Sequence, residues 1–72
     1  MKTGDTVRTR PTLPGRDLFL SNTAARRPDT RGTLGLMVPG YGGDVWWVRH
    51  DDAAPDAPQV PYVVDEFDVV QP

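Results

Sequence analysis

Aromatic and arginine side chains are the residues of this chain best suited to recognising a partner. Trp47 and Arg49 lie two positions apart in a β-forming run, so both side chains point to the same face of a strand. Tyr41 and Tyr62 are expected nearby once the strands fold together. Interface hot spots are rich in Trp, Tyr and Arg. These four residues are therefore the candidate binding site, and the expected partner is another protein.

A structural interpretation of the same residues stays open. Trp46 would lie in the core, Trp47 would cover one end of the fold, and Arg49 would stack on the indole ring of Trp47. Large aromatic side chains dominate the energetics of protein cores as well as interfaces. Residue type alone does not separate the two interpretations.

A cluster of arginines offers an alternative binding surface. Arg26, Arg27 and Arg31 lie close together in the sequence, and phosphate groups of a nucleic acid would be their natural partner. The pI of about 5.0 argues against this alternative, because the basic footprint of a nucleic-acid-binding domain usually carries a pI above about 9. We expect these arginines to pair with Asp51 and Asp52 instead.

Charge is divided unequally along the chain. Residues 1–36 hold seven basic and three acidic side chains, whereas residues 37–72 hold one basic and seven acidic side chains. Such asymmetry can mark an interaction surface. The simpler expectation is that the two halves neutralise each other in the folded domain.

Neither catalysis nor metal binding is indicated by the sequence. The chain has no Cys and one His. The run His50-Asp51-Asp52, with Asp56 nearby, does not match the spacing of a calcium-binding loop. Carboxylates act as an acid/base pair only in a pocket that separates their pKa values, and an exposed acidic turn offers none. We expect no catalytic residue, no metal ion and no cofactor.

Length and composition predict one small domain over residues 1–72. With no Cys, no disulfide can stabilise it. No apolar run approaches the roughly 20 residues of a membrane span, and the N-terminus lacks the apolar stretch of a signal peptide. A cytoplasmic protein without a membrane partner is expected.

Glycine and proline punctuation predicts an all-β fold. Seven Gly and eight Pro leave no stretch long enough for a substantial amphipathic helix. Asp65-Glu66-Phe67 is expected to form a 3-10 turn with Asp65 as its N-cap. Short β-forming runs between the breakers predict five strands, at residues 5–10, 33–38, 45–50, 60–64 and 68–70.

Alternation along these strands predicts which side chains face inward. In the third strand, Trp46 is expected inside and Trp47 outside. In the second strand, Leu34 and Leu36 share a face and are both expected in the core. Gly35 between them predicts a bulge, a tight bend or a close backbone approach. The predicted core therefore comprises Leu34, Leu36, Val48 and Phe67.

A long first loop, residues 11–30, separates the first two strands. Pro14-Gly15 signals a turn, and the apolar patch Leu18–Leu20 is expected to fold back over an open end of the core. Residues 21–30 carry almost no apolar anchor, so they are expected to be the most mobile interior segment.

The order of these elements resembles the SH3-like small β-barrel, the architecture of SH3, KOW and Tudor domains. The resemblance is carried by the segments Gly4–Arg8, Gly32–Gly35, Val45–Val48 and Asp65–Val70 and by Tyr62. It implies a single five-stranded barrel with a long first loop and a 3-10 turn before the last strand. It also implies binding through an aromatic-lined groove between the first loop and the hairpin loop. A fold shared by many activities does not fix the function.

Overall fold

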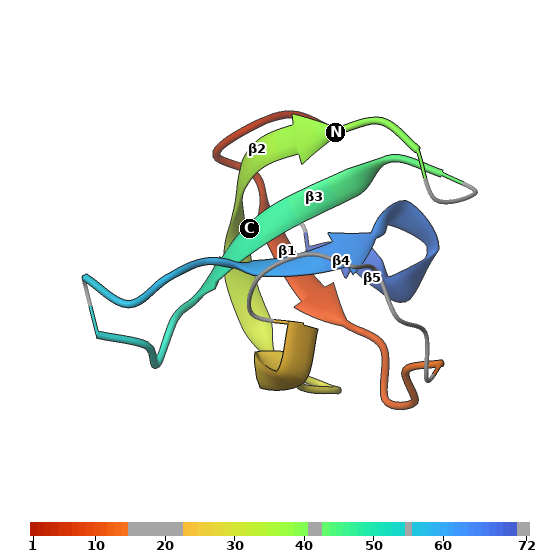
Figure 1. Ribbon diagram of the computed structural model, residues 1–72. Helices are drawn as coiled ribbons and strands as arrows, with labels where there is room; N and C mark the ends of the chain where they lie inside the picture. Colours follow the sequence, from red (N-terminus) through yellow and green to blue (C-terminus); the bar gives the residue numbers. More distant parts are fainter. Residues whose placement is uncertain (15–22, 41–42, 55, 71–72) are drawn as a thin grey trace.

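The computed structural model describes residues 1–14, 23–40, 43–54 and 56–70, and it is all-β within these ranges. Figure 1 shows the strands and the two short 3-10 turns. The strands are β1 (Thr6–Thr9), β2 (Arg31–Val38), β3 (Val45–His50), β4 (Val60–Val63) and β5 (Phe67–Val69), and the turns are η1 (Thr23–Ala25) and η2 (Val64–Glu66). Among the described residues, no helix has the length and apolar character needed to span a membrane.

The five strands form one antiparallel sheet in the order β4-β3-β2-β1-β5. The prediction of five short strands is therefore confirmed. The sheet is open, with β4 and β5 as its edges, so closure into a barrel is not confirmed. The edge position of β4 accounts for Pro61, because a proline has no N–H to donate to a further strand.

The core lies on the inner face of this sheet. Trp46 and Val48 of β3 point inward and Arg49 points outward, as alternation predicts. Leu34 and Phe67 are buried, which confirms their assignment to the core. The main apolar cluster consists of Val7, Leu34, Trp46, Val48, Val60, Tyr62 and Phe67.

The prediction for Leu36 is wrong, and a bulge in β2 explains why. Leu34 pairs with Val48 and Met37 pairs with Trp46, so two residues of β2 lie opposite the single residue Trp47. This extra residue interrupts the alternation along β2. Leu36 is consequently 68% exposed instead of buried beside Leu34.

The end of the Gln59 side chain lies against Gly35 at the bulge. A Cβ built at Gly35 would lie 2.4 Å from the Oε1 atom of Gln59. Real Cβ atoms do not approach other heavy atoms so closely. The expectation of a bulge or bend at Gly35 is confirmed.

The turn before β5 is present but is capped differently from the prediction. It begins at Val64, and the residue before it, Val63, occupies the N-cap position. The Glu66 carboxylate reaches back to accept a hydrogen bond from the Val63 N–H, with N and Oε1 2.7 Å apart. Glu66, and not Asp65, therefore supplies the capping side chain. The predicted apolar patch Leu18–Leu20 lies outside the described residues.

The two leucines of β2 give a matched test of the bulged register. Leu34→Ala is expected to reduce the free energy of unfolding by about 2–5 kcal/mol, since it empties a packed site. Leu36→Ala, which removes the same atoms from an exposed site, should change it by less than about 0.5 kcal/mol. Urea denaturation of both variants measures the difference. Equal losses would show that Leu36 is part of the core.

Candidate functional site

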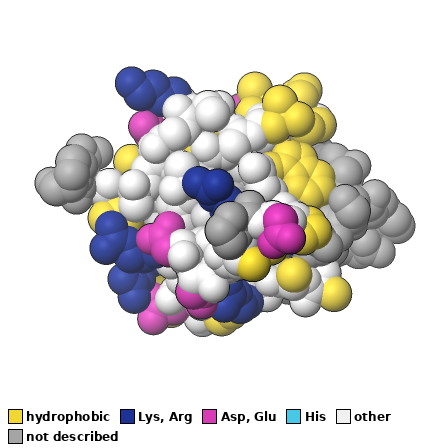
Figure 2. Space-filling view, turned by 90° about the vertical axis from the view of Figure 1, so that its left-hand side faces the viewer, with side chains coloured by type: hydrophobic (Ala, Val, Ile, Leu, Met, Phe, Trp, Pro, Cys, Tyr) yellow, Lys and Arg dark blue, Asp and Glu magenta, His cyan; other side chains and the backbone are white. Residues whose placement is uncertain are grey.

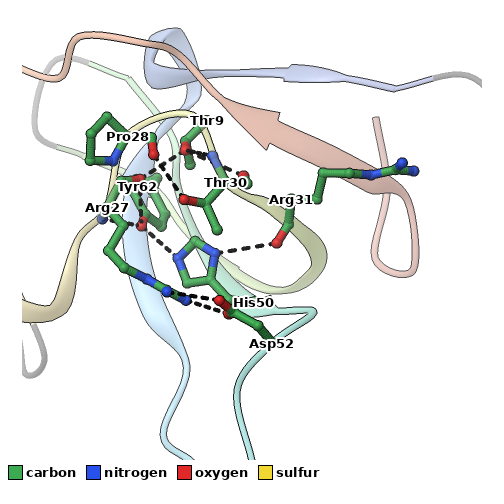
Figure 3. Close-up of polar contacts among 8 residues, drawn as sticks. All are labelled: Thr9, Arg27, Pro28, Thr30, Arg31, His50, Asp52 and Tyr62. Carbon is green, nitrogen blue, oxygen red and sulfur yellow. Dashed lines mark hydrogen bonds and ion pairs between the residues drawn. The ribbon is translucent and has the colours of Figure 1, made fainter.

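A buried tyrosine attaches the end of the first loop to the sheet. Tyr62 of β4 is fully buried, yet its hydroxyl reaches the chain at Arg27. The Arg27 N–H donates a hydrogen bond to the Tyr62 hydroxyl oxygen, with N and O 2.8 Å apart (Figure 3). A buried hydroxyl must find such partners, because an unsatisfied one is costly.

The imidazole of His50 is the second partner of this hydroxyl. His50 is 3% exposed, and its Nδ1 atom lies 3.3 Å from the carbonyl oxygen of Arg31. A carbonyl oxygen only accepts, so we assign the proton to Nδ1. Nε2 then accepts the Tyr62 O–H, with N and O 2.7 Å apart. Both ring nitrogens are thereby satisfied in the neutral form.

Burial also sets the ionisation of this pair. Desolvation lowers the pKa of His50 below its ordinary value, and the hydrogen bond to the Arg31 carbonyl opposes this only in part. Desolvation likewise raises the pKa of Tyr62 above its ordinary value. Both rings therefore stay neutral at neutral pH, which suits a structural hydrogen bond better than proton transfer to a ligand.

Thr9 of β1 also attaches the end of the first loop to the sheet through hydrogen bonds. Its hydroxyl donates to the carbonyl oxygen of Arg27, at 2.8 Å, and accepts from the N–H of Thr30, at 2.9 Å. The Asp29 N–H donates to the carbonyl oxygen of Arg10. The end of the first loop thus lacks apolar anchors, as predicted, but hydrogen bonds attach it to the sheet.

The arginine cluster does not form a continuous basic surface. The guanidinium of Arg26 is buried, where it pairs with the buried carboxylate of Glu66 and lies 5.4 Å from the centre of the Tyr62 ring. Arg27 is paired with Asp52, as expected, and this contact lowers the pKa of that carboxyl. Asp51 makes no such pair with Arg27.

The structure also favours mutual neutralisation of the two halves of the chain. Basic and acidic side chains are interspersed on the face of the molecule shown in Figure 2. Of the three clustered arginines, Arg31 alone points outward from a strand, and its side chain leads away from the buried network (Figure 3).

No arrangement for metal binding or acid/base chemistry is formed by the described residues. They contain no group of three His, Asp or Glu side chains that could hold a metal ion. His50 and Asp52 are engaged by Tyr62 and Arg27. An open groove of about 470 Å³ beside His50 has mostly small apolar walls, formed by Ala24, Ala25, Ala53, Ala57, Pro58 and Val60, with Arg27 at its side.

The predicted aromatic site is brought together only in part. Trp47 is half-buried and Arg49 is exposed, both on the outer face of β3. Tyr62 is fully buried on the inner face, so it does not share a surface with Trp47. Tyr41 lies outside the described residues. The structure adds Leu36, which alternation had assigned to the core.

His50 and Glu66 are the buried polar residues whose roles sequence reasoning missed. His50 was interpreted as part of a solvated turn, although it shares the parity of Trp46 and Val48. That parity is a usable signal for burial. Nothing in the local sequence marks Glu66 as the partner of Arg26, because the two lie 40 residues apart.

Comparison with known proteins gives no assignment. No protein-family model matches the chain, and neither the curated proteins nor the solved structures contain a significant match.

The buried histidine makes stability depend on pH. A protonated His50 has no acceptor nitrogen for the Tyr62 O–H, so the folded state resists protonation of this ring. The histidine of the unfolded chain, which is not restrained in this way, therefore takes up a proton first as the pH falls below about 6.5. The free energy of unfolding should therefore be highest above that pH and should decrease as the pH falls toward the lowered pKa of folded His50. Denaturant unfolding between about pH 7.5 and 5.5 measures this decrease.

The control is His50→Asn, because His50 is the only histidine of the chain. The variant should lose stability but should show a flatter dependence on pH in this range. An equally steep decrease in the variant would assign the effect to other groups.

Proposed function

We propose that this chain is a non-enzymatic protein-interaction module that docks its partner on the outer face of β2 and β3. The docking residues are Trp47, Leu36 and Arg49. The observation that carries the proposal is the bulge, because it puts Leu36, 68% exposed, on the stretch of β2 that lies opposite the half-buried Trp47.

Two adjacent apolar side chains are more informative than one. A single exposed leucine is normal on a protein surface, whereas neighbouring large apolar residues flanked by polar ones mark interaction sites. Leu36 is one of the two bulge residues of β2 that lie opposite Trp47. Trp47 therefore offers an aromatic contact beside the aliphatic Leu36, and Arg49 borders it on the same strand.

Trp47 also contributes to the packing of the sheet. Its cross-strand neighbour Pro61 is buried, so part of the indole belongs to the packed sheet. The exposed remainder is the part available to a partner. A rigid, half-buried aromatic side chain loses little conformational entropy on binding.

We also propose that the architecture is SH3-like. The strand order β4-β3-β2-β1-β5 and the 3-10 turn η2 before β5 support this proposal. The two edges of the sheet would then correspond to the open seam of a small barrel. The nucleic-acid alternative is weaker, because Arg26 and Arg27 are engaged by Glu66 and Asp52.

Replacing the two neighbouring tryptophans separates docking from folding. Trp47→Ala should abolish capture of the partner from an extract of the source cells while the domain still unfolds cooperatively. Trp46→Ala should reduce the free energy of unfolding by about 3–5 kcal/mol, because it empties the core. Affinity capture, read out by mass spectrometry, and thermal unfolding are the two measurements.

Arg10→Ala serves as the surface control, since Arg10 follows β1, outside β2 and β3, and pairs with Asp68. It should retain the captured partner. Capture that survives Trp47→Ala and Leu36→Ser unchanged would exclude the outer face of β2 and β3 as the docking surface.

A further inference from the structure

We infer that the outer face of β2 and β3 takes an acidic, extended peptide segment that carries an apolar residue next to its carboxylates. The inference rests on the proposed function and specifies the chemistry of the partner. Arg31 and Arg49 would bind the carboxylates, while Trp47 and Leu36 would contact the apolar side chain.

The first support is the contrast between paired and unpaired arginines. Four arginines form ion pairs with carboxylates: Arg8 with Asp29, Arg10 with Asp68, Arg26 with Glu66 and Arg27 with Asp52. Within the described part of the chain, Arg31 and Arg49 form none. The described residues thus include two exposed guanidinium groups without a counter-ion, in a chain that contains more acidic than basic side chains.

The second support is that these two arginines are neighbours on one face. Arg49 of β3 pairs with Thr33, and Arg31 precedes Thr33 by two residues on β2. The arginines therefore occupy diagonal positions of an antiparallel pair, about 7–8 Å apart between Cα atoms. Both side chains are exposed, whereas Gly32 between Arg31 and Thr33 is buried.

The surface beside Arg49 leaves room for a carboxylate. A hollow of about 330 Å³ is lined by Thr33, Arg49 and Asp51, together with His50 and Ala53. Asp51 is the acidic residue at this hollow, and its carboxylate forms an ion pair with neither arginine. Arg8 lies directly opposite Arg31, but its guanidinium is engaged by Asp29 at 2.7 Å.

Energetics favour filling this site with an anion. Arg31 and Arg49 carry like charges at diagonal positions, and a carboxylate that contacts both would offset their repulsion. Hydrogen bonds from a guanidinium to a carboxylate are short, and they are stronger than those between neutral groups. Opposite charges across an interface also steer the encounter and fix the register.

The spacing of the residues defines the order of side chains in the peptide. Alternate residues of an extended chain point the same way and repeat about every 6.6 Å. A peptide lying along β3 would put an apolar residue over Trp47 and Leu36, an acidic residue two positions later at Arg49, and a second acidic residue two further on near Arg31. The expected pattern is apolar-x-acidic-x-acidic.

A protein segment fits this face better than a nucleic acid. Leu36 offers an aliphatic surface, which neither a phosphate nor a ribose requires. Among the described residues, this face carries two arginines without an ion pair, Arg31 and Arg49, and Asp51 lies at its border. A nucleic-acid surface needs a broader field of cations.

Labelled synthetic peptides test the inference without knowledge of the natural partner. The probe is a seven-residue peptide Ser-Leu-Ser-Asp-Ser-Asp-Ser, and its matched control has Asn in place of both Asp residues. The acidic probe should bind at least about tenfold more tightly than the control. Amide chemical-shift changes in the ¹⁵N-labelled protein should centre on Arg31, Leu36, Trp47 and Arg49.

Charge variants of the protein complete the test. Arg31→Gln and Arg49→Gln should each weaken binding of the acidic probe about five- to tenfold and should bring its affinity close to that of the Asn control. Arg10→Gln, which removes a paired arginine elsewhere, should leave the affinity unchanged. Unfolding curves of all variants should match that of the wild type.

The peptide experiments distinguish an error in the expected peptide sequence from an error in the proposed docking face. Equal binding of both peptides at Trp47 would overturn the acidic preference and leave docking at this face intact. The amide chemical shifts could also stay unchanged with both peptides while Trp47→Ala still abolishes capture of the partner. This result would overturn the inference about the acidic peptide and would leave the proposed docking face intact. If a single-stranded oligonucleotide binds through Arg31 and Arg49 more tightly than the acidic probe, the inference is overturned and the partner of this face is a nucleic acid.

Discussion

The bulge in β2 is the constraint on which the exposed surface of this domain depends. Without it, Leu36 would follow Leu34 into the core, and the outer face would present Trp47 alone. The register shift between Leu34 and Met37 instead turns Leu36 outward. Gly35 lies at this shift, and the end of the Gln59 side chain lies against it. One extra residue in a strand thus removes a leucine from a small core and adds it to a candidate docking face.

A polar network stabilises the opposite, inner side of the same sheet. A domain of this size buries only about 60% of the surface that its unfolded chain exposes, and the end of the first loop brings few apolar side chains. Hydrogen bonds between Arg27 and the hydroxyls of Tyr62 and Thr9 attach that loop to the strands instead, and His50 binds the same Tyr62 hydroxyl. The buried pair of Arg26 and Glu66 lies next to the same ring. The acidic second half of the chain therefore serves in part to hold the basic first half in place.

Local pattern predicted those features that depend on local geometry. Strict alternation placed Trp46 and Val48 inside and Arg49 outside, because side chains of a regular strand point to opposite faces in turn. It failed for Leu36, since the register shift between Leu34 and Met37 turns Leu36 outward, and alternation within β2 alone does not show how β2 pairs with β3. The ion pair of Arg26 with Glu66 could not be predicted either. The sequence shows that Arg26 is positively charged, but it does not show which of the ten acidic residues lies beside Arg26 in the folded domain. Closure of the sheet was inferred from resemblance alone, and the strands leave it open.

Cross-strand proton contacts between β2 and β3 test the central claim most directly. Nuclear Overhauser spectroscopy of the labelled protein reports which backbone protons of the two strands lie opposite each other. The bulged register predicts contacts between Leu34 and Val48 together with contacts between Met37 and Trp46. Contacts between Leu36 and Trp46, alongside those of Leu34 and Val48, would show an unbroken strand with Leu36 in the core. That result would contradict the proposed docking face.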